Sequence, residues 1–174
     1  YFDIEDDPTQ GLVYFFGLVL RNRHGRDDFL YFLADGPAEE ENTVRLFWQF
    51  LADHPQAVYY VYSAKERSTL RALQRRYGLD PDVLAQYERQ EFDLYKFIVD
   101  YSDWPTHSYG IKQIARQVGF SWRDHDPSGA NSIAWFNDYL KDPTRKELLT
   151  RILEYNEDDC RAMIAIKEWF ERRR

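Results

Sequence analysis

The chain has 174 residues, of which 44% are hydrophobic and 17% aromatic, and its formal net charge is -7. This composition is too apolar for a disordered chain, and no segment approaches the roughly 20 apolar residues of a membrane-spanning helix. The negative charge argues against a broad surface for polyanions, although it does not exclude an enzyme whose carboxylates hold divalent cations.

The single cysteine and the first residues set further expectations. Cys160 has no partner for a disulfide framework or a cysteine-rich zinc site, which favours a reducing, cytoplasmic location. The length is that of one ordinary domain, and the sequence starts without methionine inside a strand-like segment. We therefore expect residues 1–174 to form one domain excised from a longer multidomain protein.

Three apolar segments separated by short polar turns predict an antiparallel meander at the start of the chain. These strands are expected at the opening YFDIE, at Leu12–Leu20 and at Phe29–Ala34. Ala57–Tyr62 has the composition of a short fourth strand.

Helical patterns occupy most of the remaining chain. Helices are expected after Glu39–Glu41 with a buried stripe at Val44, Phe47, Trp48 and Leu51, at Lys65–Tyr77 before Gly78, at Phe92–Tyr101, from a cap at Ser108 through Val118, at Asn131–Leu140, and from a cap at Asp142 to Phe170 as one or two helices. This order of elements indicates an α/β fold with a mixed sheet and helical layers.

Asp3 and Glu5 are the first candidate functional residues. Successive side chains of a strand alternate, so these two carboxylates would share one face while Phe2 and Ile4 share the other. Two neighbouring carboxylates repel each other unless one is protonated or a cation lies between them. The pair therefore marks either an exposed strand face or a metal site.

Two later segments add further acids. Glu66 follows the expected strand at Ala57–Tyr62 and falls in the first turn of the next helix, where a negative charge is also common for structural reasons. Tyr155 and Asp159 are four residues apart in EYNEDD, hence on one helix face. In isolation, that segment favours ordinary core spacing over a site.

The acids of the three segments are more informative together than each is alone. Four carboxylates can hold two hard divalent cations roughly 4 Å apart, and such ions activate a water and stabilise the leaving oxygen of a phosphoryl displacement. This chemistry accounts for acids rather than cysteine or histidine at the candidate positions.

These segments resemble the three motifs of DEDD-type 3'-5' exonucleases in the ribonuclease H-like superfamily, with the tyrosine of the DEDDy branch. More closely, FDIEDDP followed by YFFG, SYGIKQIARQVGF, SGANSIAWF and EYNEDDCRAM resemble the RNase H-like nuclease domain of bacterial proteins associated with RecB-like nuclease and helicase modules. The resemblance covers nearly the whole chain. It implies a five-stranded mixed sheet, with the first three strands antiparallel, flanked by helices.

Carried over to this sequence, the resemblance makes Asp3, Glu5, Glu66 and Asp159 ligands of two Mg²⁺ or Mn²⁺ ions. Tyr155 would orient or deprotonate the attacking water, and both roles stay open because its ordinary pKa is near ~10.

The second motif departs from the family pattern, because most relatives have aspartate where this chain has Glu66. Asp93 in EFDLYKF is the reserve candidate for that position. Lys112 and Arg116 are spaced to meet phosphates from one helix face, although two basic residues four apart are also ordinary on a helix surface.

The sequence and the resemblance thus predict a metal-dependent 3'-5' exonuclease that hydrolyses single-stranded DNA or RNA by a two-metal-ion mechanism. The expected partner is a nucleic-acid 3' end, with no membrane and with further nuclease or helicase domains in the parent chain. The alternatives are a catalytically weak nucleic-acid-binding module and a structural module, each assisting a linked nuclease or helicase. The choice between DNA and RNA stays open.

Overall fold

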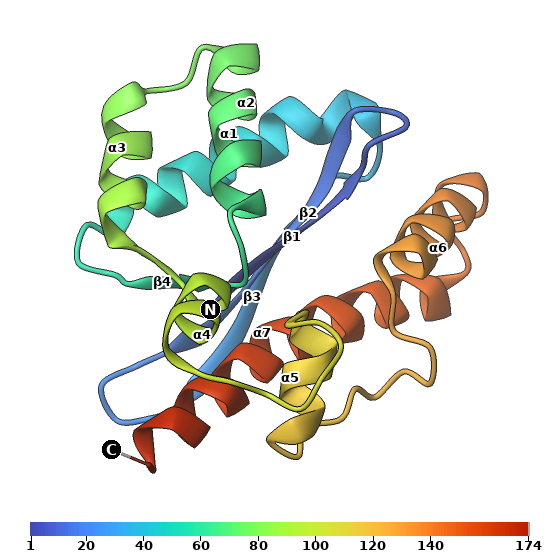
Figure 1. Ribbon diagram of the computed structural model, residues 1–174. Helices are drawn as coiled ribbons and strands as arrows, with labels where there is room; N and C mark the ends of the chain where they lie inside the picture. The colour runs from blue at the N-terminus through green and yellow to red at the C-terminus, as the bar shows by residue number, and fades with distance from the viewer. Residues whose placement is uncertain (174) are drawn as a thin grey trace.

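The computed structural model describes residues 1–173, which form two sheets and a set of helices (Figure 1). The strands are β1 (Phe2–Asp7), β2 (Leu12–Arg21), β3 (Asp27–Leu33), β4 (Tyr59–Val61) and β5 (Glu91–Asp93). The helices are α1 (Glu40–Asp53), α2 (Lys65–Tyr77), α3 (Pro81–Gln90), α4 (Leu94–Tyr101), α5 (Ile111–Gln117), α6 (Gly129–Lys141) and α7 (Lys146–Glu171), and a short 3-10 turn at Pro37–Glu39 precedes α1.

The antiparallel meander predicted from the sequence is confirmed. β1, β2 and β3 pair in that order, so β2 is the central strand and β1 forms one edge. Asp3 lies opposite Gly17 in the β1–β2 ladder, and the register shifts between Glu5 and Asp6. Up to that bulge, Asp3 and Glu5 share one face of β1, as the alternation of side chains requires.

The expectation of a single five-stranded sheet is wrong. β4 and β5 pair in parallel with each other and form a separate two-stranded sheet. Each has only three residues, so neither extends far enough to provide a long backbone ladder. β5 also occupies the start of a segment for which the sequence predicts a helix, and α4 follows it directly.

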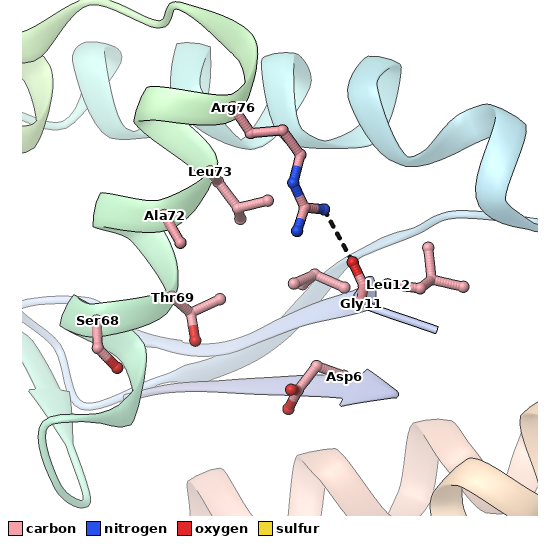
Figure 2. A pocket seen from close by; sticks show the side chains of 9 residues that line it. Asp6, Gly11, Leu12, Ser68, Thr69, Ala72, Leu73 and Arg76 are labelled. Atoms are coloured by element: carbon pink, nitrogen blue, oxygen red, sulfur yellow. Dashed lines mark hydrogen bonds between the residues drawn. The ribbon is translucent and has the colours of Figure 1, made fainter. Parts of the chain in front are cut away.

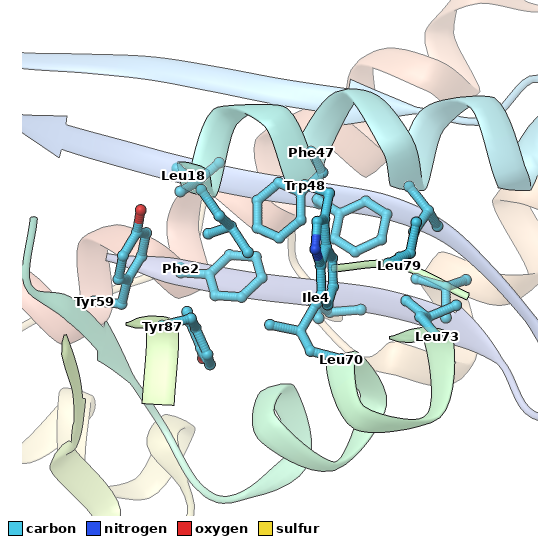
Figure 3. Close-up of a cluster of buried hydrophobic side chains, with 14 of the residues drawn as sticks. Phe2, Ile4, Leu18, Phe47, Trp48, Tyr59, Leu70, Leu73, Leu79 and Tyr87 are labelled. Carbon is cyan, nitrogen blue, oxygen red and sulfur yellow. The ribbon is translucent and has the colours of Figure 1, made fainter. Parts of the chain in front are cut away.

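Two hydrophobic clusters cover the opposite faces of the three-stranded sheet. Phe16 and Leu18 of β2 belong to the cluster under α1, α2 and α3, part of which is drawn in Figure 3. Tyr14 and Phe15 of β2 belong to the other cluster, which α5, α6 and α7 cover. Both faces of β2 are therefore buried, which explains why its sequence is a nearly continuous apolar run.

Several helix boundaries differ from the predicted ones because the expected cap residues do not stand at the N-cap positions. α2 has the predicted bounds and ends at Gly78, whose left-handed conformation suits glycine. Ser108 does not cap α5, since Gly110 occupies the N-cap position without a side-chain hydrogen bond. Asp142 ends α6 instead of starting the last helix, and its carboxylate binds the backbone N–H and hydroxyl of Thr144. The closing helix is the single long α7.

α3 lies in a stretch for which no specific element was predicted, and the Asp80 carboxylate caps its start by accepting a hydrogen bond from the N–H of Asp82. Within residues 1–173, no helix combines the length and the apolar character that crossing a membrane requires.

Candidate functional site

Three carboxylates meet where α7 crosses the edge strand β1. Asp3 and Glu5 come from the shared face of β1, and Asp159 comes from α7, which packs on β1 and β2. Each residue offers one carboxylate oxygen, and these oxygens all lie within 4.8 Å of one another. Asp3 is half-buried, whereas Glu5 and Asp159 are only 5% and 6% exposed. The structure thus brings together three of the four predicted metal ligands.

Burial and mutual repulsion raise the pKa of these acids, so they ionise less readily than free carboxyl groups. Burial first, and the charge of Asp159 second, raise the pKa of Asp3 to about 7. Burial and the charge of Asp3 raise the pKa of Glu5 in the same way. The pKa of Asp159 is also raised by burial, although nearby donors and the charge of Lys112 oppose the shift. A divalent cation between the three carboxylates would remove this penalty.

Tyr155 lies one helical turn before Asp159 and is 4% exposed. Burial, followed by the charges of Asp159, Glu5 and Asp3, raises its pKa well above the usual range, so its hydroxyl keeps its proton at neutral pH. Lys112 of α5 donates from Nζ to the Tyr155 hydroxyl at 3.2 Å. The predicted substrate-binding lysine therefore lies beside the predicted catalytic tyrosine.

Two polar residues at this site were not predicted from the sequence. Asn156 is fully buried, and its Nδ2 donates to Asp3 Oδ2 at 2.8 Å and makes a longer contact of 3.4 Å with Glu5 Oε1. Trp122 donates from Nε1 to Asp159 Oδ1 at 2.7 Å. Asn156 stands inside the EYNEDD motif, which was a usable signal, whereas Trp122 lies two residues after the SYGIKQIARQVGF segment and its residue type alone does not indicate a role at the site.

Lys65, the first residue of α2, is a second cation beside the carboxylates. Its Nζ donates to the carbonyl oxygen of Ile4 at 2.9 Å and pairs with Asp6 Oδ1 at 2.8 Å. Burial acts to lower the pKa of Lys65, but the charge of Asp3, the ion pair with Asp6 and the charge of Glu5 outweigh it and raise the pKa. Lys65 thus holds its proton and offsets part of the negative charge of β1.

Glu66 follows Lys65 and is buried, with 2% of its surface exposed. It lies outside the group of three carboxylates whose oxygens are within 4.8 Å of one another. Burial, and then the charge of Asp3, raise the pKa of Glu66 to about 8, so the two carboxylates do interact. Its Oε2 is buried and has no hydrogen-bond partner among residues 1–173. Its predicted role as a ligand stays a prediction.

The structure gives Asp93, the reserve candidate, a local role. Its carboxylate Oδ1 accepts from the backbone N–H of Lys96, which caps α4, and from that of Ser63 after β4. It does not belong to the group of three close carboxylates found among the described residues. Arg116 is exposed on α5, one turn after Lys112.

A cavity of about 230 Å³ lies between α2 and the hairpin that joins β1 to β2 (Figure 2). Asp6 lines it from β1, and Arg76 reaches across from α2 to donate to the carbonyl oxygen of Gly11 at 2.9 Å. None of the three close carboxylates lines this cavity. It therefore borders the strand of the site without containing the acidic cluster.

The donor set of the cluster suits a hard divalent cation. The group offers only carboxylate oxygens, which Mg²⁺ and Mn²⁺ favour, and contains neither histidine nor cysteine. Its members stand close enough for one ion to contact all three, and the pKa of each is raised without such an ion. Asp3, Glu5 and Asp159 therefore fit a metal centre by chemistry and by geometry.

Comparison with known proteins gives one match. The family model of the RNase H superfamily matches residues 1–171. Neither the curated proteins nor the solved structures provide a significant match. The superfamily match agrees with a cluster of acids on the first strand and the last helix, since nucleases of this kind typically use divalent metals. Because the match spans nearly the whole chain, the protein belongs to the RNase H superfamily, and this membership indicates nuclease-type processing of nucleic acids.

Proposed function

We propose that the protein is a metal-dependent 3'-5' exonuclease that hydrolyses the terminal phosphodiester bond of single-stranded DNA or RNA. One observation carries the proposal: the carboxylates of Asp3, Glu5 and Asp159 lie within 4.8 Å of one another, and Tyr155 stands one turn before Asp159 on α7. This arrangement unites the first and the last motif of the exonuclease pattern at one point.

Electrostatics supports a metal-binding role for the cluster. Two carboxylates 4.8 Å apart repel each other by about 3 kcal/mol at an effective dielectric constant of about 20. Cations that neutralise these three carboxylates would therefore stabilise the folded state. In the proposed activity Asp3, Glu5 and Asp159 hold Mg²⁺ or Mn²⁺. When bound, two such ions activate a water and stabilise the leaving oxygen of an in-line displacement.

Tyr155 and Lys112 supply the remaining polar groups of the proposed reaction. In the metal-free fold the Tyr155 hydroxyl keeps its proton, and in the proposed reaction it orients the attacking water by a hydrogen bond. Lys112 donates to the same hydroxyl and would offer its positive charge to a phosphate oxygen of the substrate.

Glu66 is the proposed fourth ligand, and it would complete a site for a second ion. Two observations support this role: its charge interacts with that of Asp3, and its buried Oε2 has no hydrogen-bond partner within the described chain. A buried carboxylate oxygen without a hydrogen-bond partner lowers the stability of the fold unless a bound ligand contacts it.

A catalytically weak nucleic-acid-binding module that assists a linked nuclease or helicase is the second candidate. The position of Glu66 outside the tight group favours it, because a site that binds only one ion would retain substrate contacts but lose most of its activity. The resemblance to domains that accompany RecB-like nuclease and helicase modules supports the same type of partner for either candidate.

The test is digestion of single-stranded DNA and RNA, labelled at either end, in the presence of Mn²⁺. The proposal expects stepwise loss of nucleotides from the 3' end, abolished by Asp3→Ala and strongly reduced by Tyr155→Phe. Asp28→Asn, on the exposed side of β3, serves as the matched acidic control and should digest as the wild type does. Degradation that does not depend on Asp3 would refute the exonuclease, and binding without degradation would favour the second candidate.

A further inference from the structure

Asn156 is the polar residue that contacts both carboxylates of β1. It is completely buried, and its Nδ2 lies 2.8 Å from Asp3 Oδ2, 3.4 Å from Asp3 O and 3.4 Å from Glu5 Oε1. An amide nitrogen has two hydrogens, so one group can serve acceptors on two neighbouring side chains. Asn156 therefore links α7 to the same pair of acids that forms the metal centre with Asp159.

Gly17 provides the space that Asn156 occupies. It lies opposite Asp3 in the β1–β2 ladder, and a Cβ atom built on it would stand 1.7 Å from Asn156 Oδ1 and 2.7 Å from Asn156 Cγ. The same atom would stand 2.9 Å from Cε1 of Phe15. Gly17 is not among the described residues with positive φ, so backbone conformation does not demand glycine here. Glycine weakens the interior of a strand, and close approach of another group is the usual reason for it.

Packing alone does not explain an asparagine at position 156. Its Oδ1 is buried against Gly17 and has no hydrogen-bond partner among residues 1–173, which costs stability. The opposite amide orientation would turn this oxygen toward two carboxylates, where acceptor would face acceptor. The gain that offsets the orphaned oxygen is the N–H donor directed at Asp3 and Glu5.

We infer that Asn156 is a positioning residue whose amide, seated against Gly17, holds the carboxylates of Asp3 and Glu5 at the spacing that a divalent cation requires. This inference rests on the proposed metal centre. Asn156 acts through Asp3 and Glu5, as groups that hydrogen-bond to metal ligands commonly do, and Gly17 is needed because it leaves room for the amide. Substitution of such supporting groups typically lowers metal affinity by about 10- to 100-fold.

The first test is calorimetric titration of Mn²⁺ into the 174-residue chain. Asn156→Ala should bind Mn²⁺ about 10- to 100-fold more weakly than the wild type. The matched control is Asn137→Ala, which loses amide hydrogen bonds to Asp7 and Gln10 away from the cluster and should keep wild-type affinity. Affinity of Asn156→Ala within twofold of the wild type would overturn the inference. A merely structural role would lower the thermal stability of both variants alike without changing the affinity of either.

Asp3→Ala separates this inference from the proposed function. If the wild type does not bind Mn²⁺, or if Asp3→Ala binds it equally well, the metal centre itself is refuted. If Asp3→Ala loses binding while Asn156→Ala keeps it, the metal centre stands and only the role of Asn156 fails.

A double-mutant cycle tests the role of Gly17. Gly17→Ala should weaken Mn²⁺ binding in the wild type but have a much smaller effect in the Asn156→Ala background, because the clash with the amide is gone and only the Phe15 ring must move. Gly129→Ala, whose Cβ meets nothing within 4 Å, is the matched glycine control. If Gly17→Ala folds only together with Asn156→Ala, the role of Gly17 in leaving room for the amide is supported, and the effect of Asn156 on the carboxylates is decided by the Mn²⁺ affinity of Asn156→Ala alone. Equal effects in both backgrounds, or unfolding in both, would contradict it.

Discussion

Asp3→Asn should stabilise the metal-free protein at neutral and alkaline pH. The pKa of Asp3 is raised by burial and by Asp159 to about 7 in the folded chain, so folding penalises its ionised form. The sign follows from this direction: the penalty is absent below the unfolded pKa near ~4 and grows as pH rises toward about 7. Asparagine removes the charge but keeps an oxygen that can accept the hydrogen bond from Asn156.

The size of the effect follows from the same shift. The pKa rises from 3.8 to about 7, roughly three units, and each unit corresponds to about 1.4 kcal/mol, so the penalty at pH 8 is about 4 kcal/mol. Adjustment of the surrounding groups to the new amide offsets part of this gain. We expect a net stabilisation of about 1–4 kcal/mol, equivalent to an increase in Tm of roughly 2–16 °C for a chain of this length.

The assay is thermal unfolding of wild type and Asp3→Asn in EDTA between pH 4 and pH 8. The two Tm values should agree near pH 4 and diverge as pH rises, with the variant more stable. Asp28→Asn, whose side chain is 57% exposed, is the control for the substitution and should change stability by less than about 0.5 kcal/mol. An equal or lower Tm for Asp3→Asn at pH 8 would refute the reasoning.

Mn²⁺ should narrow this difference, and should reverse the order only where the extra gain of the wild type exceeds the advantage of the variant. The wild type gains about 2.7 kcal/mol when free metal exceeds its Kd by 100-fold, whereas a variant that lacks one ligand gains less at the same concentration.

Three further predictions concern residues around the site. Asp7→Asn should lower stability by about 1–3 kcal/mol at pH 7, because the carboxylate accepts several hydrogen bonds that hold its pKa well below its usual range; the deficit should shrink in unfolding curves below pH ~4, where the unfolded carboxyl is protonated. Asp93→Ala should cost about 1 kcal/mol of stability through loss of a helix cap, and calorimetry should find Mn²⁺ affinity unchanged; weaker binding would assign Asp93 to the metal centre. Trp122→Phe removes the donor to Asp159 and should weaken Mn²⁺ binding by about 10-fold, and equal affinity would contradict its supporting role.

The elements that the sequence predicts well are those in which a hydrophobic pattern continues over many residues. β2 has a nearly continuous apolar run because both of its faces are buried, and α2 is bounded by Lys65 and Gly78 as expected. The errors are at caps and at β5. Ser108 and Asp142 are typical cap residues, but whether a cap starts or ends a helix depends on how the neighbouring chain packs, which local sequence does not contain. β5 has three residues and is defined only by pairing with β4.

At the site, too, residues recognisable from the local sequence were predicted, and residues that depend on contacts distant in the chain were missed. Strand alternation was enough to place Asp3 and Glu5 on one face, whereas the choice of Asp159 among the acids of EYNEDD came from its combination with the other acids and from the resemblance to the exonuclease motifs. Asn156 and Trp122 are neutral polar residues whose function comes from partners about 150 and 37 positions away in the chain. Their hydrogen bonds to the carboxylates form only in the folded chain, where α7 lies across β1 and the loop after α5 reaches Asp159.

The charges around the cluster explain how the metal-free fold tolerates it. Three carboxylates share one small volume, and Lys65 and Lys112 reduce the cost because their positive charges lower the pKa of Asp3 against the effect of burial. Asn156 adds a neutral donor where a further acid would add repulsion. The lysines do not cancel the penalty, since the pKa of Asp3 remains raised. This remaining excess of negative charge favours cation binding at the proposed metal centre.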